Sequence, residues 1–246
     1  GFGTDIFINV EQVNVTSVSG SDVFRPDDDQ ANDFDAGDGT DWIDYSFLST
    51  GVDVDLSTGI ATGDGNDTLA NFENISGSTD NDTLTGDSTA NVIDGNIGDD
   101  IINGGDGDDT LIGNTGNDTI DGGLGTDTFD ESNATTAMDV ILISGTTGSS
   151  TSSGQGNDEL TSIENVNTGS GNDTFSITDS GDNIINASSG TDVATVENGS
   201  GTITVTRSGD DVIVSDDGGG IGTDEYNSVE QVNVSGSASN DTFIVD

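Results

Sequence analysis

The chain has 246 residues, of which 48 are acidic and only 2 are basic, so its formal net charge at pH 7 is −46. A chain with this charge cannot neutralise phosphates, which argues against nucleic acid and anionic membranes as partners. Because it has no cysteine and no histidine, zinc, copper, haem and iron–sulfur centres lack their usual ligands, and the abundant oxygen donors favour Ca²⁺ over Mg²⁺.

Residues 1–76 contain degenerate copies of a nine-residue pattern. AGDGTDWID (36–44) and TGDGNDTLA (62–70) keep a Gly-x-Asp core, and GFGTDIFIN at the start of the chain is a copy that lacks its first glycine. Because glycine tolerates positive φ, such a segment folds into a tight bend whose carboxylate and carbonyl groups face a common centre. The bend carboxylates expected here are Asp5, Asp41 and Asp67.

The first irregular segment, 45–61, has a different composition. It is rich in Ser, Thr and alternating apolar residues, which predicts an antiparallel hairpin or a widened coil that protrudes from the repeats. Trp42 and Tyr45, near its start, allow two interpretations. They could stack on a sugar ring, or they could cover the end of a thin hydrophobic core, which is the commoner role of such residues.

Residues 77–130 repeat every nine residues without a gap. The six copies are GSTDNDTLT from Gly77, GDSTANVID from Gly86, GNIGDDIIN from Gly95, GGDGDDTLI from Gly104, GNTGNDTID from Gly113 and GGLGTDTFD from Gly122. Those from Gly104 and Gly122 fit the pattern G-G-x-G-x-D-x-U-x, with U a large apolar residue, at every fixed position. Those from Gly95 and Gly113 miss only the second glycine.

Each copy reads as a half-turn that consists of a cation-binding bend and a three-residue strand. Two copies close one turn, so every second copy stacks on the same edge. Successive turns then pair as parallel strands roughly 4.8 Å apart, and their single apolar side chains stack into a thin core. These side chains are Leu84, Ile93, Ile102, Leu111, Ile120 and Phe129.

This segment resembles the calcium-binding nonapeptide of the RTX (repeats-in-toxin) family of secreted bacterial toxins, adhesins and exoenzymes. The resemblance implies an all-β fold, a right-handed parallel β-roll or β-solenoid, in which each Ca²⁺ lies between one bend and the bend two copies later. The implied carboxylate columns are Asp82, Asp100 and Asp118 on one edge and Asn91, Asp109 and Asp127 on the other. The implied glycine ligands are Gly95, Gly104, Gly105, Gly107, Gly113, Gly116, Gly122, Gly123 and Gly125. Asn91 departs from the pattern and predicts the weakest of the four sites between turns.

Residues 131–246 return to degenerate copies with insertions. Three further copies place Asp173, Asp192 and Asp241 in bends. The insertions 131–155 and 196–226 alternate apolar and polar residues and predict β-hairpins, the last with a Gly-containing turn that begins at Ser208. A separate β-sandwich formed by 196–246 is the alternative. The chain thus divides into degenerate repeats (1–76), a regular β-roll (77–130) and degenerate repeats with hairpins (131–246).

A longer repeat overlies the nonapeptides. VEQVNV from Val10, FENI from Phe72, IENV from Ile163 and VEQVNV from Val229 each precede a bend aspartate by a short spacer. The first and last copies are the most alike, and both ends of the chain fall within repeats. We therefore interpret the chain as about one unit of a tandem array. Its expected partners are neighbouring copies stacked end to end, in one polypeptide or in a filament.

The composition predicts that folding requires a cation. With 29% hydrophobic residues and a net charge of −46, apolar burial cannot offset chain entropy and self-repulsion. Calcium outside the cell then supports folding, and the resemblance implies a secreted or cell-surface bacterial protein exported by type I secretion. No segment is apolar over the length that a membrane span needs, and none has the pattern of a signal peptide.

Three functions are compatible with this sequence. The leading interpretation is a non-enzymatic, calcium-dependent structural module, such as an adhesin stalk, an extracellular fibre or a surface-layer element. The alternatives are an accessory RTX domain of a secreted protease, lipase or epimerase, and a carbohydrate-binding module that uses Trp42 to bind a glycan. Pairs of acidic residues could indicate glycosidase chemistry, but their nine-residue spacing is better explained by metal ligation.

Overall fold

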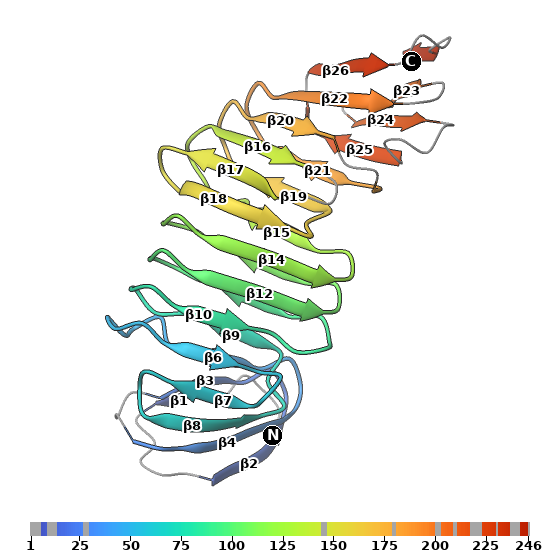
Figure 1. Ribbon diagram of the computed structural model, residues 1–246. Helices are drawn as coiled ribbons and strands as arrows, with labels where there is room; N and C mark the ends of the chain where they lie inside the picture. The colour runs from blue at the N-terminus through green and yellow to red at the C-terminus, as the bar shows by residue number, and fades with distance from the viewer. Residues whose placement is uncertain are drawn as a thin grey trace. The chain divides into compact units, whose positions relative to one another are not determined.

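The computed structural model describes residues 6–8, 14–26, 30–143, 147–178, 181–199, 203–208, 211–216, 223–229, 231–236 and 242–245. Figure 1 shows short β-strands joined by turns and bends, and none of the described residues is helical. In this part of the chain no helix is therefore long and apolar enough to cross a membrane. The all-β class predicted from the sequence is confirmed.

The first of two compact units comprises Gly1–Asp127 and contains two sheets. Its first sheet has the strand order β1 (Ile6–Ile8), β3 (Val23–Arg25), β5 (Trp42–Asp44), β9 (Asn74–Ser76), β11 (Val92–Asp94) and β13 (Thr110–Ile112). Its second sheet has the order β2 (Asn14–Ser19), β4 (Asp33–Asp38), β8 (Asn66–Ala70), β7 (Ile60–Thr62), β6 (Asp53–Asp55), β10 (Thr83–Thr85), β12 (Ile101–Asp106) and β14 (Thr119–Leu124). The chain alternates between the two sheets along the repeats, as half-turns require.

The second unit comprises Thr128–Asp246 and also contains two sheets. One has the order β15 (Thr128–Glu131), β19 (Asn165–Thr168), β21 (Ile184–Asn186), β25 (Thr223–Asn227), β24 (Asp211–Asp216), β23 (Ile203–Ser208) and β27 (Thr242–Val245). The other has the order β18 (Gly156–Thr161), β17 (Gly148–Ser152), β16 (Met138–Leu142), β20 (Thr174–Ile177), β22 (Val193–Gly199) and β26 (Gln231–Gly236).

The parallel pairing in the regular repeats has the register that the sequence predicts. Leu84 of β10 lies opposite Ile102 of β12, which lies opposite Ile120 of β14. In the other sheet Ile93 of β11 lies opposite Leu111 of β13. Each partner lies two nonapeptides further along the chain, so two nonapeptides make one turn. These five side chains are at most 1% exposed, as is Phe129 in the second unit, which confirms the predicted apolar positions.

Positive φ angles explain why two repeats tolerate asparagine at the second glycine position. Gly105 and Gly123 have φ angles of 108° and 99°, and Asn96 and Asn114, at the equivalent positions, have φ angles of 69° and 60°. Asparagine is the residue that most readily replaces glycine in the left-handed region. The repeats from Gly95 and Gly113 therefore keep the same bend.

The three predicted insertions contain antiparallel three-stranded segments, which we call meanders. They are β6–β7–β8 (53–70), β16–β17–β18 (138–161) and β23–β24–β25 (203–227). In the last, Ser208 pairs with Asp211, which confirms the predicted hairpin. Strand β25 pairs in parallel with β21, and β26 with β22. Segment 196–246 thus extends the sheets of its unit, and the alternative of a separate β-sandwich is wrong.

The longer repeat corresponds to a recurring backbone feature. In three copies the residue before the motif has a positive φ angle, and the first apolar residue of the motif is buried. The pairs are Asn71–Phe72, Ser162–Ile163 and Ser228–Val229, with φ angles of 57°, 53° and 58°. The side chains of the copy from Val10 lie outside the described residues. Each of these three copies follows the last strand of a meander, so the motif returns the chain from the meander to the parallel repeats.

Candidate metal centre

The bends of the regular repeats stack through a hydrogen bond from the main chain to a carboxylate. In each column, the backbone N–H of one bend residue donates to Oδ1 of the bend aspartate 18 residues later. The bonds join Asp82 to Asp100 (2.8 Å), Asp100 to Asp118 (2.9 Å), Asn91 to Asp109 (2.7 Å) and Asp109 to Asp127 (2.8 Å). The two predicted columns are therefore present and in register.

The second carboxylate oxygen of two central bends has no hydrogen-bond partner among the residues that the structure describes. Oδ2 of Asp100 and Oδ2 of Asp109 are buried and accept no hydrogen bond. Each of these side chains is only 1% exposed. A buried polar group without a partner costs about 1–3 kcal/mol, and more if it is charged. A cation at this oxygen would remove that cost.

Backbone carbonyl groups lie beside these carboxylate oxygens. A Cβ atom added to Gly104 would lie 2.4 Å from Oδ2 of Asp109 and 2.6 Å from the carbonyl oxygen of Gly122. Both oxygens thus lie on the same side of Gly104, where any other residue would place its side chain. The arrangement recurs at Gly77, beside Asp82 and the carbonyl of Gly95, and at Gly95, beside Asp100 and the carbonyl of Gly113. Carboxylate and carbonyl oxygens are the ligands that Ca²⁺ prefers.

The glycines expected to complete the sites all lie in or beside these bends. Four of them have positive φ angles, namely Gly105, Gly107, Gly123 and Gly125. Four others leave no room for a Cβ atom, namely Gly95, Gly104, Gly113 and Gly116. Gly122 contributes the carbonyl that faces Gly104. At the first eight of these positions glycine is thus favoured by backbone conformation or by the close approach of a bend carboxylate or of a neighbouring turn.

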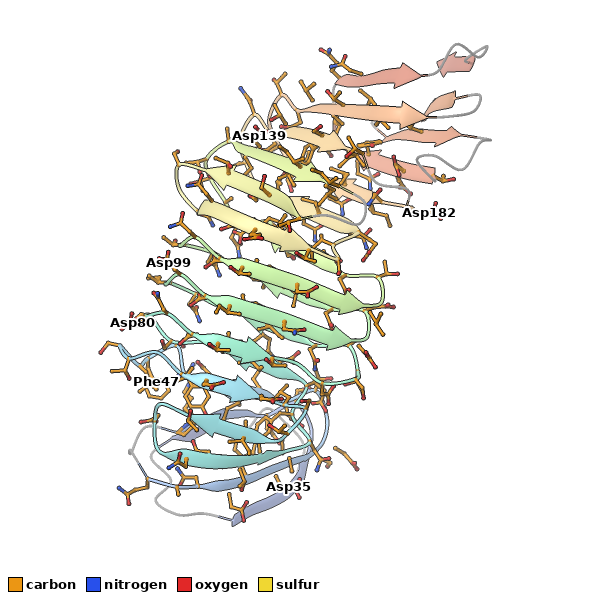
Figure 2. All side chains as sticks on the ribbon, in the orientation of Figure 1. Asp35, Phe47, Asp80, Asp99, Asp139 and Asp182 are labelled. Carbon is orange, nitrogen blue, oxygen red and sulfur yellow. The ribbon has the colours of Figure 1, made fainter. Side chains whose placement is uncertain are left out.

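A separate ladder of polar side chains lies on the outside of the same bends. The N–H of Asp99 donates to Oδ1 of Asn81 over 2.9 Å, and the N–H of Asn117 donates to Oδ1 of Asp99 over 2.8 Å. All three side chains are exposed, and Figure 2 shows Asp80 and Asp99 projecting from one edge of the ribbon. Each of these bends thus separates a solvated outer polar residue from a buried inner carboxylate.

Burial raises the pKa of the inner carboxyl groups. For Asp100 burial is the largest cause, and the carboxylates of Asp82, Asp99 and Asp94 add to it, so that its pKa rises from 3.8 to about 7 although the N–H of Asp82 acts in the opposite direction. Burial also raises the pKa values of Asp82 and Asp109. Without a cation, the folded chain therefore favours the protonated, uncharged form of these carboxyl groups.

This shift predicts that acid stabilises the fold when calcium is absent. Because the pKa of Asp100 is higher in the folded chain, its contribution to stability is complete below pH 3.8 and is lost as the pH rises through about 7. We expect the calcium-free chain to gain β-sheet circular dichroism when the pH is lowered from about 8 to about 5. Sedimentation would distinguish folding from aggregation. A signal that stays constant or falls on acidification would contradict the prediction.

Bend carboxylates outside 77–130 make the same kind of contact. Asp41, Asp67, Asp173 and Asp192 are all at most 2% exposed. Their Oδ1 atoms accept the N–H groups of Asp22 (2.7 Å), Asn32 (2.9 Å), Met138 (2.9 Å) and Asp173 (2.8 Å), respectively. The separation between partners is 19 or 35 residues, because irregular coils and meanders lengthen the turns. Asp5 and Asp241 lie outside the described residues.

Three bend carboxylates were missed by the sequence analysis. Oε2 of Glu73 accepts the N–H of Asp41 over 2.8 Å, so Glu73 takes the place of a bend aspartate. Asp158 and Asp224 are buried in GNDEL and GTDEY. Both segments keep the Gly-x-Asp core, which would have identified them, but they lie at the ends of segments that predict hairpins. The FENI motif was the available signal for Glu73.

The two aromatic residues considered for sugar stacking, Trp42 and Tyr45, differ in exposure. Tyr45 is 1% exposed, so its ring cannot stack on a sugar, whereas Trp42 is partly exposed. Nearby, Nε of Arg25 lies 2.6 Å from Oδ2 of Asp44 in a partly buried ion pair.

Backbone oxygens are needed to complete any metal site in these bends. In the part of the chain that the structure describes, no three acidic side chains converge on one point. A metal ion would take one or two carboxylate oxygens and obtain the others from carbonyl groups. Ca²⁺ accepts six to eight oxygen ligands in flexible geometry, which fits this donor set. The fold and the bends define an all-β repeat protein whose bends carry the kinds of oxygen donor that a cation needs.

A comparison with known protein families identifies the repeats. Residues 76–111 and 103–130 match the family described as RTX calcium-binding nonapeptide repeat (4 copies). The resemblance drawn from the sequence is thus confirmed for residues 76–130. RTX repeats bind calcium and are typical of secreted bacterial proteins. None of the curated protein sequences compared with the chain matches it.

Proposed function

We propose that the chain is a calcium-dependent structural module of a large secreted bacterial protein, such as an adhesin stalk, an extracellular fibre or a surface-layer element. In this proposal the paired sheets of each unit form a right-handed parallel β-roll whose turns are joined by calcium ions. The observation that carries it is the series of buried carboxylate oxygens, at Asp41, Asp100 and Asp109, that have no hydrogen-bond partner in the described part of the chain. Cations between successive turns would satisfy them.

The role is structural rather than enzymatic in this proposal. The recurrent acidic side chains accept main-chain N–H groups from neighbouring turns, as Asp100 and Asp109 do. This contact fixes the spacing of the turns. A carboxylate that serves catalysis needs access to a substrate, whereas these side chains are buried between turns.

Strand edges support end-to-end association. In the first unit β1 and β2 end their sheets, and in the second unit β27 and β26 do so. The edge of a sheet presents unpaired N–H and C=O groups that another strand can bind. We propose that neighbouring copies cover these edges, either within one polypeptide or in a filament.

A fusion of two copies tests this proposal. In calcium, two copies joined directly should unfold in one transition at a higher temperature than a single copy, because the junction covers strand edges. Two copies joined by a flexible Gly/Ser linker of about 20 residues are the control, and they should unfold like the single copy. Negative-stain microscopy should show calcium-dependent rods for the direct fusion. Identical unfolding of both fusions and the single copy would contradict end-to-end stacking.

A further inference from the structure

The bends of the first unit are of two kinds, as Asn91 and Asp109 show. A Cβ atom added to Gly86 would lie 2.4 Å from Oδ1 of Asn91, and one added to Gly104 would lie 2.4 Å from Oδ2 of Asp109. The two oxygens therefore occupy equivalent positions. Oδ1 of Asn91 accepts the N–H of Asp87 over 2.8 Å, whereas Oδ2 of Asp109 has no partner.

The amide nitrogen of Asn91 makes a second bond that a carboxylate could not make. Its Nδ2 donates to the carbonyl oxygen of Glu73 over 2.7 Å. In the second unit, Nδ2 of Asn183 donates to the carbonyl oxygen of Glu164 over 2.8 Å. Both glutamates belong to the longer repeat, FENI in one case and IENV in the other. A carbonyl engaged in this way points at an amide rather than at a cation.

Two aspartate bends are closed by a serine or a threonine of the preceding segment. Oδ2 of Asp82 accepts the N–H of Ser78 over 2.6 Å, and its Oδ1 accepts the Ser78 hydroxyl over 2.8 Å. Oδ2 of Asp173 accepts the hydroxyl of Thr168 over 2.6 Å. In these bends the second carboxylate oxygen, which lacks a partner in Asp100, is satisfied by the chain itself.

Two more aspartate bends are closed by buried tyrosines. The hydroxyl of Tyr45 donates to Oδ2 of Asp67 over 3.4 Å, and that of Tyr226 donates to Oδ2 of Asp224 over 3.2 Å. Tyr45 and Tyr226 are at most 1% exposed. A hydrogen bond from a buried tyrosine to a bend aspartate thus occurs in both units.

These closed aspartate bends lie where a meander interrupts the repeats. Asp67 and Asp224 belong to β8 and β25, the last strands of two meanders. Asp82 and Asp173 accept N–H groups from the residue before β6 and from the first residue of β16. At these places a meander strand replaces the neighbouring turn of the regular repeats on one side, so that Asp82, for example, adjoins the residue before β6 on one side and the carbonyl of Gly95 on the other.

We propose that bends closed by the chain's own donors hold no calcium, and that ions bind only where the second carboxylate oxygen lacks a protein partner. The closed bends are those of Asp67, Asp82, Asn91, Asp173 and Asp224. Hydrogen-bond donors there replace the cation, so the contacts in these bends need no metal ion of their own. We call the bends whose second carboxylate oxygen lacks a protein partner open bends. The inference rests on the proposed function, in which these open bends bind calcium.

The substitution Asn91→Asp tests the inference by converting a closed bend into an open one. It places a carboxylate beside the Glu73 carbonyl and removes the amide donor. We expect one additional calcium ion per chain, counted by native mass spectrometry or equilibrium dialysis of the whole chain. The matched control is Asn81→Asp, which makes the same charge change at an exposed position of a bend and should leave the count unchanged.

A second variant, Tyr45→Phe, opens a bend without adding charge. It keeps the volume of the ring and removes the donor to Asp67, so the calcium count should again rise by one. Unchanged counts in both variants, with calcium bound by the wild type, would overturn the inference and leave the proposed function intact. Failure of the wild type to bind calcium would instead overturn the proposed function. An Asn91→Asp chain that does not fold even in saturating calcium counts against the inference, because an open bend would be stabilised by its ion.

Discussion

In millimolar calcium we expect a β-sheet circular dichroism spectrum, and in excess chelator at neutral pH we expect this spectrum to be lost. The chain carries a net charge of −46, and the open bends bury carboxylates such as Asp100 and Asp109 without a protein partner. An uncompensated buried charge costs several kcal/mol, against a total stability of about 5–15 kcal/mol for a typical domain. Each calcium site at tenfold excess over its Kd would return about 1.4 kcal/mol.

Two controls distinguish ligation from screening of charge. Magnesium at the same concentration should not restore the spectrum, because it retains its waters and requires tighter octahedral geometry than Gly-rich bends supply. Sodium chloride at about 1 M screens surface repulsion but does not ligate the buried oxygens, so it should not restore the spectrum either. A spectrum unchanged by chelator, or folding driven by sodium chloride alone, would contradict a fold that depends on calcium ligation.

The regular repeats could be predicted from the sequence because the residues of each repeat determine both where the bend lies and which side of the strand is buried. Glycine and asparagine fix the bends, and one apolar residue per repeat fixes which side of the strand is buried. A shift of the register by one residue would place Leu84 or Ile102 in solvent. The spacing of the strand partners followed directly from two repeats per turn. The bend aspartates followed from the same period.

The remainder of the site depends on contacts that the repeat period does not encode. Tyr45 reaches Asp67 across 22 residues, and Glu73 reaches Asp41 across 32 residues. These separations along the sequence depend on the size of the intervening meander. The composition shows the meander only as an irregular segment. The alternation of the segment 45–61 predicts strands but not which bend they adjoin. The sequence signalled the bend of Asn91 as a departure, whereas the closing contacts of Asp67, Asp82, Asp173 and Asp224 were accessible only from the structure.

Removal of a single open-bend carboxylate should lower calcium affinity and cooperativity together. Oδ1 of Asp109 accepts the N–H of Asn91, and the N–H of Asp109 itself donates to Asp127. The substitution Asp109→Ala leaves the buried N–H of Asn91 unpaired, which costs about 1–3 kcal/mol, and removes an ion ligand as well. Asp100→Ala should act in the same way, because Asp100 links Asp82 to Asp118.

Calcium titrations followed by circular dichroism would measure this effect. For Asp109→Ala and Asp100→Ala we expect the half-saturating calcium concentration to rise on the order of tenfold, and the transition to become less steep, since about 1.4 kcal/mol corresponds to a factor of ten. The control Asp106→Ala removes the same charge from an exposed side chain and should shift the midpoint little. Asp109→Asn separates the two losses, because its amide oxygen can still accept the N–H of Asn91 while the charge is gone. Equal shifts for Asp106→Ala and Asp109→Ala would show that calcium acts through net charge, because only the buried carboxylate is placed to ligate an ion.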